Sequence, residues 1–274
     1  MSADDDLDDA DLDDADQVAL EQALEALESG DVEQALGHLA DVDEERGERW
    51  TTTAHAWIEM GELAAAEEAL TRARGLLGTD HPEIAWTEGR LRLNRWDLDG
   101  ARSAFAQLDL DQEGAPLCEN LAILADLAGE TEHADELYRR AAELDPEGSP
   151  PPARLTPEQF EDVVAEAASD LPDEFHDALE EVPVVIDPMP TAGLVGAPES
   201  GHPPDILGLF VGPALAERNG TTELPPTIFL FQRNLERVAR TRAELRDEIR
   251  TTLYHELGHA LGFDEEGVDE LGLG

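Results

Sequence analysis

The chain of 274 residues carries 65 acidic and 18 basic side chains, which gives a formal net charge of −47 at pH 7. A surface of this charge repels phosphate backbones and anionic lipids, so neither nucleic acid nor membrane is an expected partner. The hydrophobic fraction of 41% is ordinary for a folded protein, and the length suffices for one large domain or two smaller ones.

The basic residues are all arginine. An acidic, lysine-free composition fits a protein that works in high salt, although nucleotide-composition bias combined with an acidic tail explains it as well. Cys118 is the one cysteine, so no internal disulfide can form, and the chain has no run of roughly 18 apolar residues that would span a membrane. These features predict a cytoplasmic protein.

Residues 1–16 contain nine aspartates and no basic residue. A signal peptide begins with positive charge and continues with an apolar core, so this segment does not resemble one. It cannot bury enough apolar surface to offset the entropy of ordering it, which predicts a disordered acidic tail.

Residues 17–147 are rich in Ala, Leu and Glu, which favour helix, and they contain an internal repeat. Four turn positions lie 31, 35 and 33 residues apart, and each is followed five residues later by an alanine. This period predicts stacked helix pairs, in which the first position turns the chain and the alanine lets the helix axes approach. The pairs of positions are Gly30 and Ala35, Gly61 and Ala66, Trp96 and Ala101, and Gly129 and Ala134.

The last copy, GETEHADELYRRAAELDP, resembles the tetratricopeptide repeat, with Gly129, Ala134, Tyr138, Ala141 and Pro146 at that family's spacings. The other copies are degenerate. The resemblance implies an all-α helical-repeat solenoid whose concave surface binds a protein partner. A helical solenoid of another kind remains the alternative.

Residues 148–157 form a proline-rich linker, because a run of three prolines is a stiff extended spacer that cannot continue a helix. The second domain, residues 158–274, reads as a small α+β domain. Its predicted elements are a helix capped by Thr156, strands over 182–188, 206–212 and 227–231, and a helix from about Thr241 that ends at Gly262.

The last helix contains the motif HELGH. His255 and His259 are four residues apart, so both imidazoles project from one face and can converge on one metal ion. Glu256 can reach a metal-bound water as general base. Two histidines on a buried helix without a metal are the alternative interpretation.

A third ligand is available directly after the helix, in an acidic run that includes Asp264 and Glu265. In zinc sites of the HExxHxxGxxH type the third ligand stands six residues after the second histidine, and here that position is Glu265. Zinc accepts a carboxylate beside two imidazoles, so the site can close within these residues, with water as fourth ligand. A solvated acidic turn is the alternative for any one of these carboxylates.

Residues 155–274 resemble the zincin-like metallopeptidases, described as minimal matrix-metalloprotease-like domains. The stretches that carry the resemblance are FEDVVAEAASDLPDEFHDALEEVPVVID, PPDILGLFVGPAL, LPPTIFLFQRNLE and EIRTTLYHELGHALGFDEEGVDELGL. The resemblance implies a Zn²⁺ site on the terminal helix beside a short mixed sheet. The family's usual third ligand is an aspartate at the position of Glu265, and Asp264 precedes it by one residue, so both carboxylates remain candidates.

These observations predict a zinc-dependent metallopeptidase that hydrolyses peptide bonds through zinc-activated water, with Glu256 as catalytic base and a helical-repeat module for protein recognition. The substrate is expected to lie extended beside the strand at 227–231. A non-catalytic, zinc-stabilised protein-interaction scaffold is the alternative function.

Three arginines, Arg242, Arg246 and Arg250, form a stripe on the last helix. They are expected to pair on a solvated face with Glu236, Glu244 and Glu248. Docking against the acidic repeats or a substrate carboxylate is the alternative.

Overall fold

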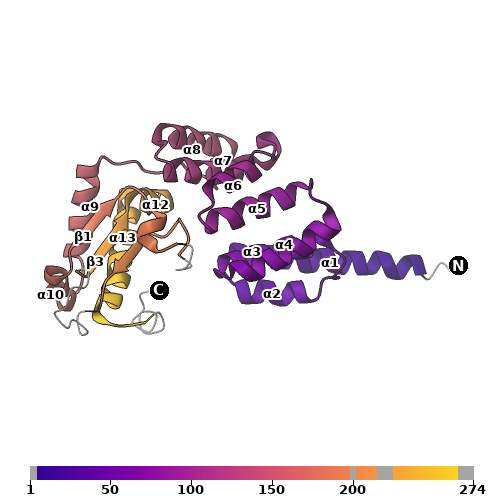
Figure 1. The fold of residues 1–274 in the computed structure, drawn as a ribbon, viewed down its shortest axis with the longest axis horizontal. Coiled ribbons are helices and arrows are strands. Elements are labelled where there is room, and N and C mark those ends of the chain that lie inside the picture. Colours follow the sequence, from indigo (N-terminus) through magenta and orange to yellow (C-terminus); the bar gives the residue numbers. More distant parts are fainter. Residues whose placement is uncertain (1–4, 198–201, 215–224, 265–274) are drawn as a thin grey trace. The chain divides into compact units, whose positions relative to one another are not determined.

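The computed structural model describes residues 5–197, 202–214 and 225–264 (Figure 1). The chain divides into two compact units, residues 1–113 with 197–203 and residues 114–196 with 204–274. Helices dominate both units, and the strands of the described chain all belong to the second. None of the described helices is long and apolar enough to cross a bilayer.

The first unit consists of helices that pack in consecutive pairs, α1 with α2, α3 with α4 and α5 with α6. The helical interior is built largely from alanine and leucine side chains, as the composition of this region predicts. In chain order the helices are α1 (Asp5–Glu28), α2 (Val32–Ala40), α3 (Gly47–Glu59), α4 (Leu63–Leu77), α5 (Pro82–Asn94) and α6 (Leu98–Phe105).

Helix α1 begins at Asp5, so residues 5–16 are helical where the sequence predicts a disordered tail. Later turns of α1 bury Leu20 and Ala23 in a cluster shared with α2. Once packing holds these turns, each upstream residue adds a helical hydrogen bond without a new nucleation step.

The four turn residues and the four alanines of the repeat have the roles that the sequence predicts for them. Gly30, Gly61 and Gly129 have φ of 80°, 74° and 76°, and Trp96 has φ of 61°. Trp96 is the one non-glycine residue with positive φ among those described, a conformation that costs a side-chain-bearing residue roughly 1–2 kcal/mol. The alanines that follow are each 0% exposed: Ala35, Ala66, Ala101 and Ala134. The assignment to the tetratricopeptide family stays a prediction.

The second unit begins with a fourth helix pair, α7 (Leu110–Leu127) and α8 (Thr131–Leu144). Helix α7 is broken at Gly114, whose φ of 66° and ψ of −142° are not helical, and the unit boundary falls at this residue. The two helices share a small core made of Ala122, Ala125, Ala134 and Tyr138.

The proline-rich linker is anchored to the helices on both sides of it by Arg154. Its guanidinium donates to Asp126 of α7 at 3.1 Å, to Asp135 of α8 at 2.8 Å and to Glu236 at 3.1 Å. Arg233 also donates to Asp126 and Asp135, both at 3.0 Å. Because the side chains of Asp126 and Glu236 are only 2% and 1% exposed, these ion pairs are part of the interior of the second unit.

The sheet has three short strands in the order β1-β3-β2, with β1 parallel and β2 antiparallel to β3. The three predicted strands and the mixed sheet are confirmed, whereas the short helices α10, α11 and α12 were not predicted. The remaining elements are α9 (Pro157–Ser169), α10 (Asp173–Glu181), β1 (Val184–Asp187), α11 (Ala192–Val195), β2 (Gly208–Val211), β3 (Thr227–Phe231), α12 (Gln232–Val238) and α13 (Arg242–Leu261).

Helix α13 is the central element of this domain and contacts α9, α10, α12, β2 and β3 (Figure 1). The apolar residues that recur every four positions, Leu245, Ile249, Leu253 and Leu257, are all 0% exposed. They pack with residues of α9, such as Phe160, and of the sheet in one core. The helix is therefore fixed along one face, which determines where its polar residues lie.

Candidate metal centre and active site

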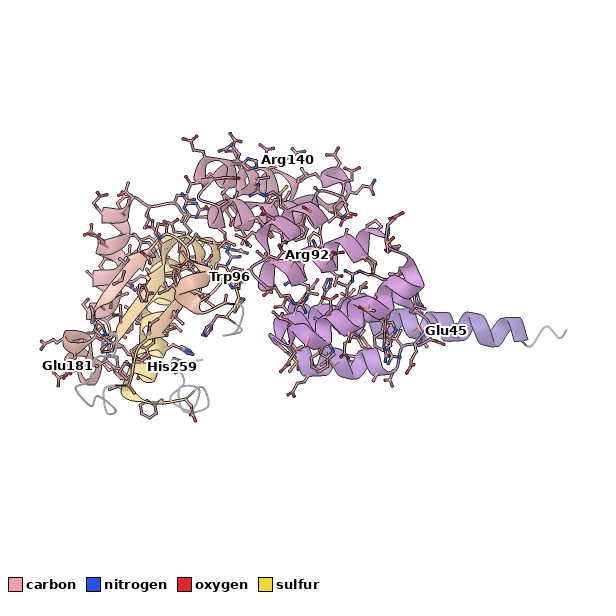
Figure 2. The ribbon with its side chains drawn as sticks, in the orientation of Figure 1. Glu45, Arg92, Trp96, Arg140, Glu181 and His259 are labelled. Carbon is pink, nitrogen blue, oxygen red and sulfur yellow. The ribbon has the colours of Figure 1, made fainter. Side chains whose placement is uncertain are left out.

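His255 and His259 lie one turn apart near the C-terminal end of α13, where Figure 2 labels His259. Their Nε2 atoms are 3.1 Å apart, and the ring centroids are 4.7 Å apart at an interplanar angle of 82°. Two nitrogens bound to one tetrahedral zinc at about 2.0–2.1 Å stand about 3.3 Å from each other. The two histidines thus fit the ion that the motif predicts.

The second ring nitrogen of His259 is held by the end of the helix. Its Nδ1 lies 3.1 Å from the carbonyl oxygen of Phe263, so Nδ1 carries the proton and donates it. Gly262, at φ 100°, ends the helix as predicted and lets the Phe263 N–H donate back to the Gly258 carbonyl at 3.0 Å. In the neutral ring this tautomer leaves a lone pair on Nε2, the atom that faces His255, as metal ligation requires.

Glu256 is 7% exposed and points its carboxylate at the sheet. Its Oε2 accepts a hydrogen bond from the backbone N–H of Phe210 in β2 at 2.7 Å. Close contact between β2 and this turn of α13 depends on Gly208. A Cβ at that position would lie 2.6 Å from Thr252 Cγ2 and 3.1 Å from Glu256 Oε1. No local sequence pattern indicates this role of Gly208, since the residues it approaches are more than forty positions away.

The segment that leads into β2 is held by Asn234 of α12, which is 1% exposed. Its amide donates to the carbonyl of Pro204 at 3.1 Å and to that of Ile206 at 2.8 Å. The strand beside Glu256 is therefore positioned by two helices, α12 at its start and α13 at its centre. No sequence pattern indicates this role of Asn234, because its partners are carbonyl groups of a distant segment.

The third metal ligand stays a prediction. Asp264 is exposed in the structure, and Glu265 lies outside the described residues. Within the segments that the structure describes, no His, Cys, Asp or Glu joins the two histidines to complete a group of three. The geometry therefore supports the histidine pair and leaves the carboxylate open.

One expectation about the substrate is wrong. The strand at 227–231, β3, is the central strand and pairs with β1 on one side and β2 on the other. Its backbone groups are taken by the sheet, so an extended peptide cannot pair with it. The strand that lies beside Glu256 is β2, which has one neighbour in the described sheet.

The arginine stripe pairs with partners other than those predicted. Arg242 donates to Glu166 at 2.8 Å, and Arg246 lies 3.6 Å from Asp170, both residues belonging to α9 or its C-cap. Of the predicted partners, Glu236 is instead buried with Arg154. The stripe thus lies on an exposed surface where α13 packs on α9.

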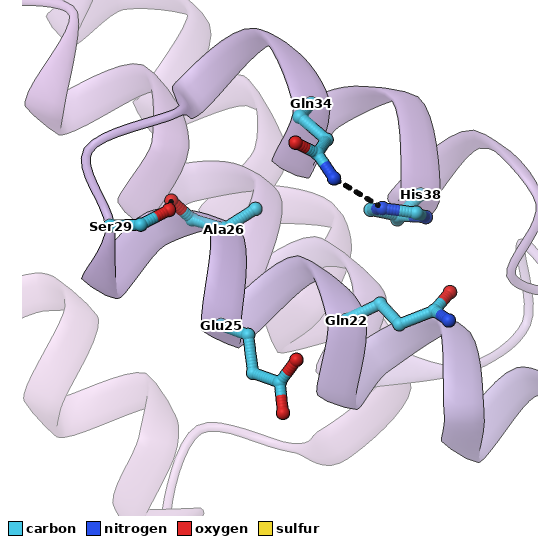
Figure 3. A pocket seen from close by; sticks show the side chains of 6 residues that line it. All are labelled: Gln22, Glu25, Ala26, Ser29, Gln34 and His38. Atoms are coloured by element: carbon cyan, nitrogen blue, oxygen red, sulfur yellow. Dashed lines mark hydrogen bonds between the residues drawn. The ribbon is translucent and has the colours of Figure 1, made fainter.

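A hollow of about 410 Å³ lies apart from these groups in the first unit, between α1 and α2 (Figure 3). Its lining offers no pair of metal ligands comparable with the histidines of α13, and we assign it no role. It is formed by Gln22, Glu25, Ala26, Ser29, Gln34 and His38.

Comparison with known proteins supports the assignment of the second domain. Residues 179–274 match the family model of the zincin-like metallopeptidases, a range that starts in α10 and includes the sheet and all of α13. No curated protein matches the chain. The matched range is shorter than the predicted resemblance over 155–274, because it begins in α10 and does not include α9. The C-terminal region that carries His255, Glu256 and His259 is thus similar to the zincin-like metallopeptidases.

Proposed function

We propose that the second domain is a zinc-dependent peptidase in which His255 and His259 hold the metal and Glu256 is the general base. The observation that carries this proposal is the convergence of two imidazole nitrogens, 3.1 Å apart, beside a buried carboxylate on the same turn of α13. When bound, zinc polarises the peptide carbonyl and lowers the pKa of water. Glu265 is the proposed third ligand, with Asp264 as the alternative.

The chain's own residues supply proton transfer and orientation. Glu256 takes the proton of the attacking water as the water oxygen bonds to the carbonyl carbon. It then passes that proton to the amide nitrogen, and the C–N bond breaks to release the amine. The Phe263 carbonyl keeps His259 in the tautomer that leaves Nε2 unprotonated.

The proposed peptide site is the outer edge of β2, which replaces the earlier expectation at β3. An extended peptide adds to a sheet edge by main-chain hydrogen bonds. The helical repeats over residues 17–147 are the proposed recognition module for a protein partner, supported by the repeat of turns and buried alanines.

Glu256→Gln tests the proposal directly. Peptide cleavage should fall by about 10²–10⁴-fold, because an amide cannot accept the proton. Zinc content by elemental analysis and the far-UV circular dichroism spectrum should not change, since Gln keeps the size and the hydrogen-bond acceptor. Equal cleavage by both proteins would show that Glu256 is not the base.

Wild-type protein with bound zinc that cleaves no member of a diverse peptide library would favour the other function. The zinc would then stabilise the C-terminal region of a protein-interaction scaffold, and the helical repeats would be the functional part.

A further inference from the structure

The backbone of β2 has an inner side that faces β3 and an outer side. The Phe231 N–H donates to the Leu207 carbonyl at 2.9 Å, which fixes the hydrogen-bonded positions of this antiparallel pair at Leu207, Leu209 and Val211. The intervening residues, Gly208 and Phe210, therefore direct their N–H and C=O groups away from β3. These are the groups that an added peptide strand would use.

The outward N–H of Phe210 donates to Glu256 Oε2 at 2.7 Å. A carboxylate accepts a stronger hydrogen bond than a neutral carbonyl does, and this carboxylate belongs to a side chain that is 7% exposed. The position that the carbonyl oxygen of a paired peptide would take beside Phe210 is thus filled by the residue proposed as general base.

We infer that Glu256 is a latch on the outer edge of β2, and that an extended peptide which pairs with Phe210 displaces its carboxylate from the strand. This inference rests on the proposed peptidase function and adds that substrate binding and release of the base are one event. Before a peptide binds, the carboxylate is held against β2. After the peptide's carbonyl has taken the Phe210 N–H, Glu256 is available to the water that attacks the neighbouring peptide bond.

In this latch, the peptide and the Glu256 carboxylate compete for the backbone N–H of Phe210. Removal of the acceptor in Glu256→Ala should strengthen peptide binding at least tenfold, because the peptide no longer has to replace a charge-assisted hydrogen bond. Glu256→Gln keeps an oxygen acceptor of the same reach but without charge, so its affinity should lie between those of wild type and Glu256→Ala.

The latch itself is tested by amide hydrogen exchange of the full-length chain without added metal. The Phe210 amide should be protected in wild type and in Glu256→Gln, and should exchange at least tenfold faster in Glu256→Ala. The amides of Leu209 and Val211, which face β3, should stay protected in all three proteins. Equal Phe210 exchange in wild type and Glu256→Ala would overturn the inference.

Displacement is tested by titrating the same metal-free proteins with a blocked pentapeptide, N-acetyl-pentaalanine amide, and following the backbone amide resonances of β2. Glu256→Ala should bind it most tightly, and binding should weaken in Phe210→Pro, which lacks the N–H, but not in Phe210→Ala, which keeps it. An edge strand tolerates proline where the N–H faces outward. Equal affinities of wild type and Glu256→Ala, or no binding to Glu256→Ala at millimolar peptide, would contradict the latch.

Neither readout requires zinc or turnover, so the two proposals can fail separately. If the zinc-bound wild type cleaves no peptide, but its Phe210 amide is protected and loses that protection in Glu256→Ala, the peptidase is rejected and the latch is kept. If cleavage depends on Glu256, but the Phe210 amide exchanges equally fast in wild type and Glu256→Ala, the peptidase is kept and the latch is rejected.

Discussion

His55 shows how one partly buried side chain sets a limit on the acid stability of the helical unit. Its Nε2 lies 3.0 Å from Thr87 Oγ1, which joins α3 to α5. Burial lowers the pKa of His55 to about 3, with a smaller contribution from the positive charge of Arg90. The ring is therefore neutral in the folded protein well below the pH at which a free imidazole takes up a proton.

The first prediction concerns acidification. Because the pKa of His55 is lower in the folded than in the unfolded chain, its contribution to stability is complete above pH 6.5 and is lost as the pH falls towards 3. The free energy of unfolding should decrease by about 1.4 kcal/mol per pH unit from this residue. Denaturant unfolding of wild type and His55→Gln between pH 7 and pH 4 measures the difference in slope.

The exposed His133, changed in the same way, is the matched control, since its side chain is 55% exposed. Both variants retain the acidic residues that titrate over the same range, so those contributions cancel. Parallel pH profiles for His55→Gln and His133→Gln would contradict the prediction.

The second prediction concerns the metal ligands. The purified protein should contain about one zinc per chain, and His255→Ala or His259→Ala should lose it, because two of three protein ligands come from α13. Glu265→Ala should also lose zinc, whereas Asp264→Ala should keep it. Elemental analysis after dialysis measures each content, and the opposite result for the two carboxylates would assign Asp264 as the ligand.

At the level of elements, α12 connects the helix pair α7 and α8 to the sheet. Its Glu236 and Arg233 belong to the ion pairs around Arg154, and its Asn234 holds the segment before β2. Burial raises the pKa of Asp126 even though Arg154 and Arg233 oppose that shift. An ionised carboxylate at the buried Asp126 therefore depends on close pairing with arginine.

The third prediction is that Arg154→Ala destabilises the second unit by about 3–5 kcal/mol, because it leaves two buried carboxylates without this partner. Arg242→Ala is the control, since Arg242 and Glu166 are 48% and 53% exposed and such pairs contribute about 0–1 kcal/mol. Urea denaturation measures both values.

The loss in Arg154→Ala should shrink on acidification. The folded pKa of Asp126 is raised, so its neutral form is favoured in the fold as the pH falls, and a neutral carboxyl does not need the cation. A loss equal to that of Arg242→Ala, or one that grows as the pH falls towards 4, would argue against the buried network.

Local sequence patterns predicted those features of the fold that depend on neighbouring residues. The four-residue spacing from Leu245 to Leu257 defined α13 and its buried face, and the repeat predicted both the turns and the buried alanines. Predictions that depended on distant contacts were weaker. Nothing near Arg154 in the sequence indicates a pairing with Glu236, and the order of strands that places β2 beside Glu256 is set by the fold as a whole.

At the level of the molecule, the contacts place the start of the second unit at Gly114 rather than at the proline-rich linker. The sequence predicts that residues 155–274 fold alone. Such a fragment lacks Arg154, Asp126 and Asp135, so Glu236 would stay in the interior without its guanidinium partner.

The fourth prediction is that a fragment of residues 114–274 folds cooperatively and melts well above a fragment of residues 155–274. A difference of about 3 kcal/mol corresponds to a shift of roughly 6–12 °C for a domain of this size. Thermal unfolding followed by circular dichroism compares the two. Equal melting temperatures would show that the linker is the true boundary and that the Arg154 pairs contribute little.

The buried position of Cys118 in α7 makes its thiol a natural probe of local opening in this part of the chain. The thiol is 0% exposed, and burial is the main cause of its raised pKa, so it is shielded from a thiol-reactive reagent while the helix pair stays closed. As the chain contains no second cysteine, each labelling event marks one opening of this region. The labelling rate therefore increases with local opening of the helix pair α7 and α8, and it can be measured without denaturant and without knowledge of the substrate.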